Sequence, residues 1–316
     1  MRGEGKVKKK LIGVGGVVLF SILVPYVMTL MFGITKNVKG ETDKVFEAEN
    51  MGQTVVISTN GKKEKLDVEM FVPCALMAVA DIDEEEEILK ALAVILRTKI
   101  LYSMQGLSSI DASDLDMEYV TYQSMEKKWK EDFSSNYNYL MKIVNNTSCQ
   151  VMTYEGDVII PYFHNVSAGA TRTGEYPYLI SAESEGDYES EDYLTMTYFT
   201  NKEFYEKICK EYQDVELSED APLETLQILE RDDAGYVCSM QIGGKVITGE
   251  SFADVFELKS TYFQVEVFNG NVRIATKGDG HGFGLSIGGC GIYAEAGWTY
   301  VQMLEHYFQG IEFTQY

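Results

Sequence analysis

One stretch near the C-terminal end combines residue types that approach ligands closely. From Lys277 to Ser286 the sequence reads KGDGHGFGLS, so four glycines alternate around the single histidine His281. Glycine lacks a Cβ atom and adopts positive φ angles, so this run either brings backbone against a ligand or forms a tight loop after a strand. Phe283 stands where a G-x-G-x-x-G motif needs its third glycine, so a nucleotide site is not indicated.

Metal and disulfide chemistry find little support in the sequence. The chain has three histidines, His164, His281 and His306, and no H-E-x-x-H motif. Its five cysteines are scattered, odd in number and never spaced as C-x-x-C. We therefore expect buried apolar thiols, no metal and no cofactor.

The charge balance excludes one class of partner. The formal net charge is −22 at pH 7, and the only dense basic stretch is the tail of residues 1–10. Nucleic acids are held by clustered Lys and Arg side chains, so a nucleic-acid partner is not expected. The acidic remainder predicts a neutral or basic partner.

The basic tail is followed by a segment long enough to cross a membrane. Residues 11–33 are uncharged and predominantly apolar, and 23 helical residues span a hydrocarbon core of about 30 Å. We predict an uncleaved transmembrane anchor, with the tail in the cytoplasm and the rest of the chain outside. A cleaved signal peptide is the first alternative, but no small-x-small cleavage site follows the segment. A buried helix of a soluble domain is the second.

The remaining pattern predicts a linker at 34–54 and one α+β domain over 55–316, with a loop-rich insert around 173–220. Asn60-Gly61 predicts a hairpin between two strands near 55–66. Asp67 is expected to cap a helix that runs to about Ala80. Further elements are expected as helices at 84–102, 124–143, 204–212 and 251–258, and as hairpins at 149–164, 226–242 and 262–275.

Over roughly residues 55–313 the sequence resembles the stage II sporulation protein D family, also called SpoIID/LytB. Four blocks carry the resemblance, in the family's order and with similar spacing. They are Leu66–Val72 with Leu89–Thr98, Tyr162–Thr171, Leu258–Phe263, and Gly280–Ser286 with Gly297–Gly310. The resemblance implies a membrane-anchored protein that faces the cell wall and handles the glycan strands of peptidoglycan, as a lytic transglycosylase does.

The implied chemistry requires one protonated carboxyl group beside the glycosidic bond. A glutamic acid protonates the glycosidic oxygen and then takes the proton of the sugar's own C6 hydroxyl, which leaves an anhydro product. In the family this acid stands eleven residues before the lysine that aligns with Lys90. That position is Val79 here, and valine neither gives nor takes a proton. Ile287 and Gly288 replace two further family residues, a glutamine and an aromatic.

Three functions of different class follow from this pattern. The first is a family member that binds glycan strands and cuts nothing, with Arg97, Thr98, Ser167, His281 and Ser286 lining the groove or, equally, serving as scaffold. The second is an active enzyme whose acid is relocated to Asp83, on the next turn if the first helix continues, or to Asp81. The third is an interaction subunit of a membrane or wall complex that docks through the acidic insert 183–192.

Overall fold

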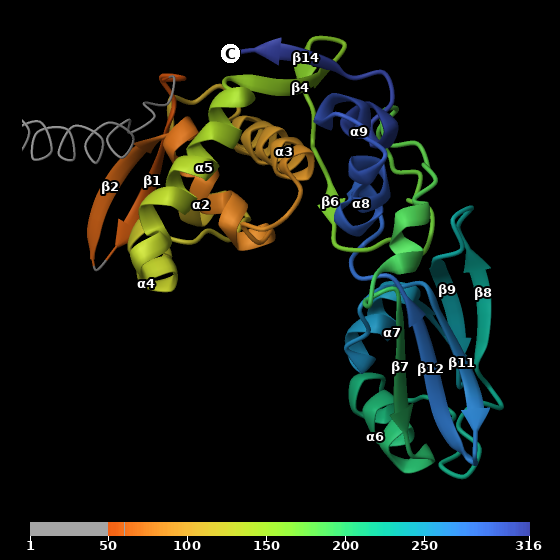
Figure 1. The fold of residues 1–316 in the computed structure, drawn as a ribbon. Coiled ribbons are helices and arrows are strands. Elements are labelled where there is room, and N and C mark those ends of the chain that lie inside the picture. Colours follow the sequence, from red (N-terminus) through yellow and green to blue (C-terminus); the bar gives the residue numbers. More distant parts are fainter. Residues whose placement is uncertain (1–49, 60) are drawn as a thin grey trace, which may run out of the picture.

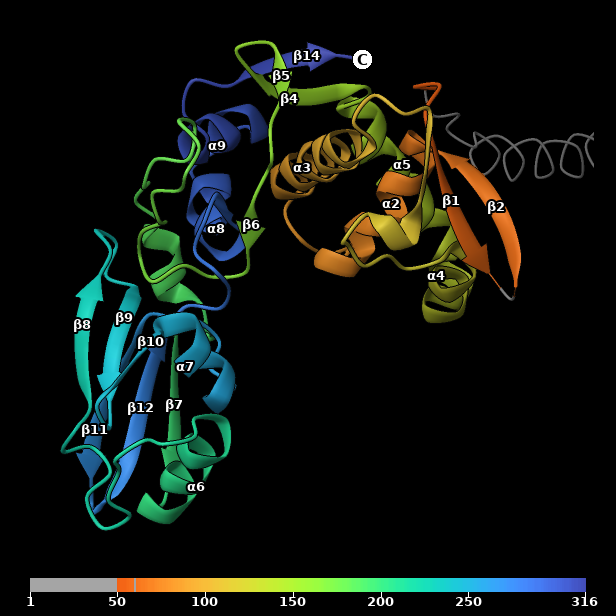
Figure 2. The same ribbon diagram turned by 180° about the vertical axis from the view of Figure 1, so that it is seen from behind.

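The structure is a computed structural model, and it describes residues 50–59 and 61–316. These residues form two lobes, seen from opposite sides in Figures 1 and 2. The helical lobe comprises residues 50–164 and 285–316, and the sheet lobe comprises residues 194–277. Each lobe has a hydrophobic cluster of its own, the larger one under the helices. The α+β class predicted from the sequence is confirmed.

In the helical lobe, helices of 8 to 19 residues pack between small sheets. Its helices are α2 (Val68–Val79), α3 (Glu86–Met104), α4 (Tyr122–Trp129), α5 (Phe133–Asn146), α8 (Ile287–Glu295) and α9 (Tyr300–Tyr307). Its strands are β1 (Thr54–Thr59), β2 (Lys62–Asp67), β3 (Ser109–Asp111), β4 (Gln150–Tyr154), β5 (Asp157–Val158), β6 (Phe163–His164), β13 (Leu285–Ser286) and β14 (Glu312–Gln315). The strand orders are β2-β1-β3, β14-β4-β5 and β13-β6, and β14 closes the lobe by pairing antiparallel with β4.

A buried ion pair ties α2 to α3 inside this lobe. Arg97 donates from Nε to Glu69 Oε1 at 2.6 Å and from Nη2 to Oε2 at 2.8 Å, and both side chains are fully buried. Arg97 also donates to the backbone carbonyl of Gln150, and Glu69 Oε1 accepts from the backbone N–H of Cys149. A bidentate pair of this kind is short, directional and costly to break once desolvated.

The sheet lobe is a three-stranded sheet and a three-stranded ribbon flanked by two helices. Its elements are β7 (Leu194–Phe199), α6 (Asn201–Glu211), β8 (Gln227–Arg231), β9 (Val237–Ile242), β10 (Lys245–Thr248), α7 (Gly249–Phe256), β11 (Phe263–Phe268) and β12 (Asn271–Lys277). The strand orders are β11-β12-β7 and β10-β9-β8. The hairpins predicted at 226–242 and 262–275 are confirmed, whereas strand β7 lies in the insert that the sequence indicated as loop-rich.

One predicted helix is divided into two. The sequence predicted a continuous helix over 124–143, but α4 ends at Trp129 and a 3₁₀ turn at Lys130–Asp132 precedes α5. Lys130 takes φ 51° and ψ −113°, which a continuing right-handed helix does not allow. The break folds α4 back against α5, so that the ring of Tyr122 contacts the ring of Phe133 with centroids 4.7 Å apart.

The expected membrane anchor lies in a part of the chain that is not described. Residues 1–10, 11–33 and most of the linker 34–54 fall outside the described residues. Among the residues that are described, no helix has the length and apolar character to cross a membrane. The anchor therefore stays a prediction from the sequence.

Removing one partner of the buried pair should destabilise the helical lobe strongly. We expect Arg97→Ala to lower the free energy of unfolding by about 3–5 kcal/mol, because the Glu69 carboxylate is left buried without its cation. The matched control is Arg273→Ala, which breaks a more exposed pair with Glu266 and should destabilise the protein much less. Urea unfolding followed by circular dichroism measures both, and equal effects would contradict this assignment.

Candidate functional site

The glycine-rich loop lies where the two lobes meet, with residues 165–193 packed beside it. All four alternating glycines of the loop have positive φ, from 68° at Gly284 to 118° at Gly280. A Cβ atom on Gly280 would lie 2.6 Å from the Cβ of His164, so a side chain there would displace the histidine. The loop is thus a tight structural element whose backbone packs against the block that begins at Tyr162.

His281 is held at the rim of this junction by aromatic and cationic neighbours. Its ring stacks on Phe283 with centroids 5.8 Å apart and meets Tyr162 edge-on at 5.7 Å. Arg172 lies over Phe283 at 4.5 Å, donates to Asp232 and donates from Nη1 to the His281 carbonyl. Although His281 is exposed, partial desolvation and the charges of Arg172 and Lys99 lower its pKa, against a backbone hydrogen bond that raises it.

A cavity of about 270 Å³ opens beside His281. Polar groups line much of it, and Lys99 donates from Nζ to the backbone carbonyl of Asp116 at its edge. The lining consists of Lys99, Tyr102, Ser103, Asp114, Leu115, Asp116, Ile160, Pro161, Tyr162, Phe163 and His281. A concave site with hydroxyl, ammonium and aromatic groups suits a ligand rich in hydroxyl groups.

Ser167 and Ser286 do not line this cavity but meet in a buried network centred on Asp187. Ser286 donates from Oγ to Asp187 Oδ1 at 2.7 Å, and the Ser167 backbone N–H donates to Oδ2 at 3.0 Å. Both serines and Asp187 are fully buried. Burial raises the pKa of Asp187, while hydrogen bonds from Ser167, Ser286 and Ser184 act in the opposite direction. The network joins the acidic insert to the start of α8.

Because of this network, part of the insert 183–192 is buried and is not a free surface loop. The sequence analysis treated that segment as a docking loop or a solvated one, but Ser184, Gly186 and Asp187 are buried. Ser184 shares a hydrogen bond of 2.8 Å with Tyr307 on α9. Glu183, Glu185, Glu189, Glu191 and Asp192 are the exposed acidic members of the segment. Three of the ten residues of the insert are therefore part of the lobe's interior.

The structure places Arg97 and Thr98 inside the helical lobe, away from any groove surface. Thr98 is fully buried, donates from Oγ1 to the Val94 carbonyl at 2.7 Å and accepts from the Met152 N–H. Arg97 is occupied by Glu69 and by the Gln150 carbonyl. For these two residues the geometry favours the scaffold role over sugar binding.

Val79 is the last residue of α2, and its half-buried side chain packs against the core of the lobe. The chain leaves the helix at Ala80, whose φ and ψ of −144° and 154° are extended. The premise that the helix continues to Asp83 is therefore wrong, and Asp83 lies in the turn before α3. Asp81 is exposed, with its carboxylate 3.4 Å from Nζ of Lys128.

Comparison with known proteins shows what this chain is similar to. Residues 58–154 match the family model described as stage II sporulation protein (SpoIID). Stage II sporulation protein D of Bacillus amyloliquefaciens is 28% identical over 273 residues, covering 82% of this chain and 77% of that protein. Its namesake in Bacillus subtilis (strain 168) is 24% identical over 286 residues, covering 86% and 81%. These matches support a member of the SpoIID family.

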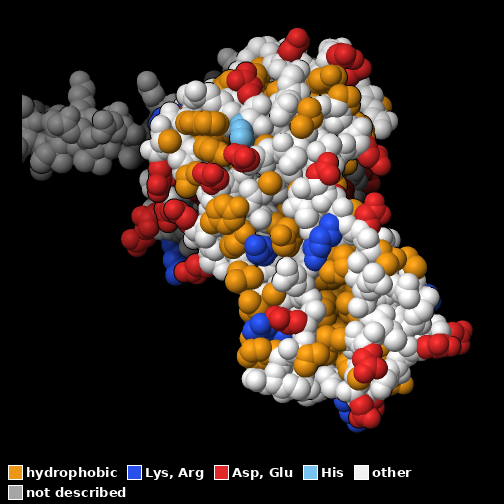
Figure 3. Space-filling view, turned by 90° about the vertical axis from the view of Figure 1, so that its right-hand side faces the viewer, with side chains coloured by type: hydrophobic (Ala, Val, Ile, Leu, Met, Phe, Trp, Pro, Cys, Tyr) orange, Lys and Arg blue, Asp and Glu red, His pale blue; other side chains and the backbone are white. Residues whose placement is uncertain are grey.

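Sequence reasoning missed two residues of this site, Arg172 and Asp187. Arg172 directly follows a recognisable block, and its position beside His281 depends on Asp232, sixty residues further along the chain. Asp187 is buried, whereas the acidic residues next to it in the sequence are exposed. Figure 3 shows acidic side chains spread over one face of the molecule, with a few lysine and arginine side chains near the junction of the lobes. No local sequence pattern distinguishes Arg172 and Asp187 from the other charged residues around them.

His164 makes the stability of this junction depend on pH. Burial lowers its pKa from 6.5 to about 3, and the neighbouring His281 adds to that effect, against the hydrogen bond to Phe283. Between pH 6.5 and about pH 3 the unfolded chain binds more protons at His164 than the folded chain does. The contribution of His164 to the free energy of unfolding is therefore fully present above about pH 6.5 and falls with acidification.

We expect wild-type protein to lose more stability than His164→Asn on going from about pH 7 to pH 4, by up to about 1.4 kcal/mol per pH unit. Asparagine has no proton to gain in this range, so the variant lacks the pH-dependent part of the stability that His164 contributes. Denaturant unfolding at several pH values measures the difference. Parallel curves for the two proteins would contradict a buried neutral histidine.

Proposed function

We propose that this protein binds peptidoglycan glycan strands outside the cell membrane and has lost the lytic transglycosylase reaction. Family membership supports the substrate, because the resemblance implies the handling of glycan strands. The predicted anchor at 11–33 supports the location, with the N-terminus in the cytoplasm and the folded domain on the far side. Other membrane or wall proteins of the sporulation machinery are proposed partners.

The observation that carries the loss of activity is Val79. A family glutamate at the end of α2 would sit at the negative end of the helix dipole and beside the core, and both effects favour a protonated carboxyl group. Such a group is suited to donate a proton to a leaving oxygen. Valine removes the group, and the loss of a general acid typically costs on the order of 10²–10⁴ in rate.

The other carboxyl groups considered for the role have unsuitable surroundings. Asp81 and Asp83 are exposed in the turn after α2, and neither lines the cavity beside His281. Asp187 has a raised pKa, but it is fully buried and engaged by Ser286 and Ser167, so a sugar does not reach it. None of these three carboxyl groups is therefore suited to protonate the glycosidic oxygen of a bound strand.

Restoring the acid should restore cleavage. We expect the full chain carrying Val79→Glu to release anhydro-muramic products from peptide-free glycan strands at least about 100 times faster than wild type. The control is Val79→Gln, which has nearly the same shape and no acid, and it should remain inactive. Mass spectrometry of the soluble products measures all three proteins.

Wild-type protein that cuts strands as fast as Val79→Glu would contradict the proposal. Loss of that activity in Asp83→Ala or Asp81→Ala would then identify a relocated acid. If strands neither bind nor break with any variant, the protein is better described as an interaction subunit.

A further inference from the structure

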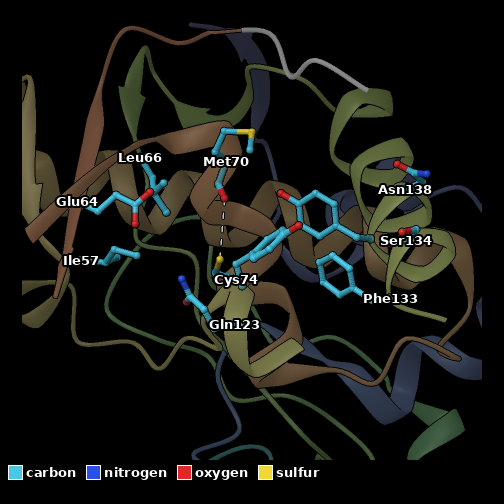
Figure 4. Close-up of a pocket in the computed structure, with 11 residues that line it drawn as sticks. Ile57, Glu64, Leu66, Met70, Cys74, Gln123, Phe133, Ser134 and Asn138 are labelled. Carbon is cyan, nitrogen blue, oxygen red and sulfur yellow. Dashed lines mark hydrogen bonds between the residues drawn. The ribbon is translucent and has the colours of Figure 1, made fainter. Parts of the chain in front are cut away.

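A second cavity lies in the helical lobe, on a different set of elements from the His281 site. It measures about 460 Å³ and opens between the β1–β2 hairpin, the first half of α2, and helices α4 and α5. Figure 4 shows Leu66 and Met70 on one side of it and Phe133, Ser134 and Asn138 on the other. Its lining consists of Ile57, Glu64, Leu66, Met70, Cys74, Tyr122, Gln123, Phe133, Ser134, Tyr137 and Asn138.

The break at Lys130 creates the aromatic wall of this cavity. In one continuous helix Tyr122 and Phe133 would be separated by roughly 16 Å along the axis. In the structure their ring centroids are 4.7 Å apart, and Tyr122 lies 5.3 Å from Tyr137. Tyr122 remains 45% exposed, so part of the ring is available to a ligand. Met70, Leu66 and Ile57 supply an apolar wall from α2 and the hairpin.

Polar side chains from the hairpin, α4 and α5 line the same cavity. The side chains of Glu64, Gln123, Ser134 and Asn138 line it, and within the described residues these four side chains make no hydrogen bond to another residue. The lining holds one carboxylate and neither lysine nor arginine. An apolar pocket with a few convergent donors and acceptors is the usual form of a small-ligand site.

We propose that this cavity binds an N-acetylglucosamine unit of a glycan strand, as a sugar site separate from the one at His281. This inference rests on the proposed function. The apolar face of a sugar ring would bury against Tyr122, and its hydroxyl groups would bond Glu64 and the two amides. The acetamido methyl group would lie on the apolar wall made by Met70 and Leu66.

The charge of the lining selects between the two sugars of a peptidoglycan strand. Muramic acid carries a lactyl carboxyl group, which is ionised in peptide-free strands. Glu64 would repel that group, and the cavity offers it no cation. The neutral N-acetylglucosamine unit meets no such penalty, so the site should accept every second sugar of the strand.

Titration calorimetry of the full chain with chitotriose, the trimer of N-acetylglucosamine, tests the proposal. We expect Tyr122→Ala to weaken binding about tenfold, the ratio equivalent to about 1.4 kcal/mol. Tyr122→Phe keeps the ring and should bind as wild type does. The matched control is Tyr198→Ala on β7, where the tyrosine is 55% exposed in the other lobe.

Three results would overturn the inference. If Tyr122→Ala binds chitotriose normally while His281→Ala does not, the sugar binds at the junction alone and the proposed function stands. If triglucosamine, with its ammonium groups, binds more tightly than chitotriose in a Tyr122-dependent manner, the cavity recognises cations. If wild type binds neither chitotriose nor peptide-free glycan strands, the proposed function fails together with this site.

Discussion

The bidentate pair between Glu69 and Arg97 is the constraint on which the helical lobe depends. It fixes the first turn of α2 against the middle of α3, and through Cys149 and Gln150 it fixes both helices to β4. Because the pair is buried and directional, α2 has one position along α3. The position of Val79, ten residues after Glu69, follows from that constraint. A residue at the end of α2 is therefore presented in a defined place, whatever its chemistry.

A second set of hydrogen bonds joins the lobes. Asp187 accepts hydrogen bonds from Ser286 at the start of α8 and from the backbone of Ser167, while Arg172 joins Asp232 of the sheet lobe to the glycine-rich loop. The residues that resemble the family's serine and glycine blocks thus hold the junction together. In this chain they act as scaffold, and the exposed chemistry of the junction comes from His281, Tyr162 and Lys99.

Local signals in the sequence predicted much of the fold. Asp67 caps α2 as expected, with its side chain accepting from the Glu69 N–H, and the hairpin turn at Asn269-Gly270 has positive φ at both residues. The helix break at Lys130 was missed, because the amphipathic pattern continues across it and lysine rarely takes a positive φ. Strand β7 was missed because its exposed positions carry Leu194, Met196 and Tyr198, which hides the polar alternation of a half-buried strand.

The candidate site was less predictable than the fold. His281 and the valine at position 79 could be singled out from motifs and their spacing, which are local properties of the chain. The burial of Arg97, Thr98, Ser167 and Ser286 depends on partners between 28 and 119 residues away, so no local pattern reports it. The aromatic cavity beside α4 likewise depends on one backbone conformation at Lys130.

The central claim is that a scaffold for gripping glycan strands remains while the placed acid is absent. Incubation of the wild-type full chain with peptide-free sacculi tests it most directly, if the bound protein in the pellet and the anhydro-muramic sugars in the supernatant are measured on the same sample. The account predicts retention of the protein in the pellet without release of anhydro sugars above the level of a protein-free control. Release that rises steadily with the amount of bound protein would contradict it.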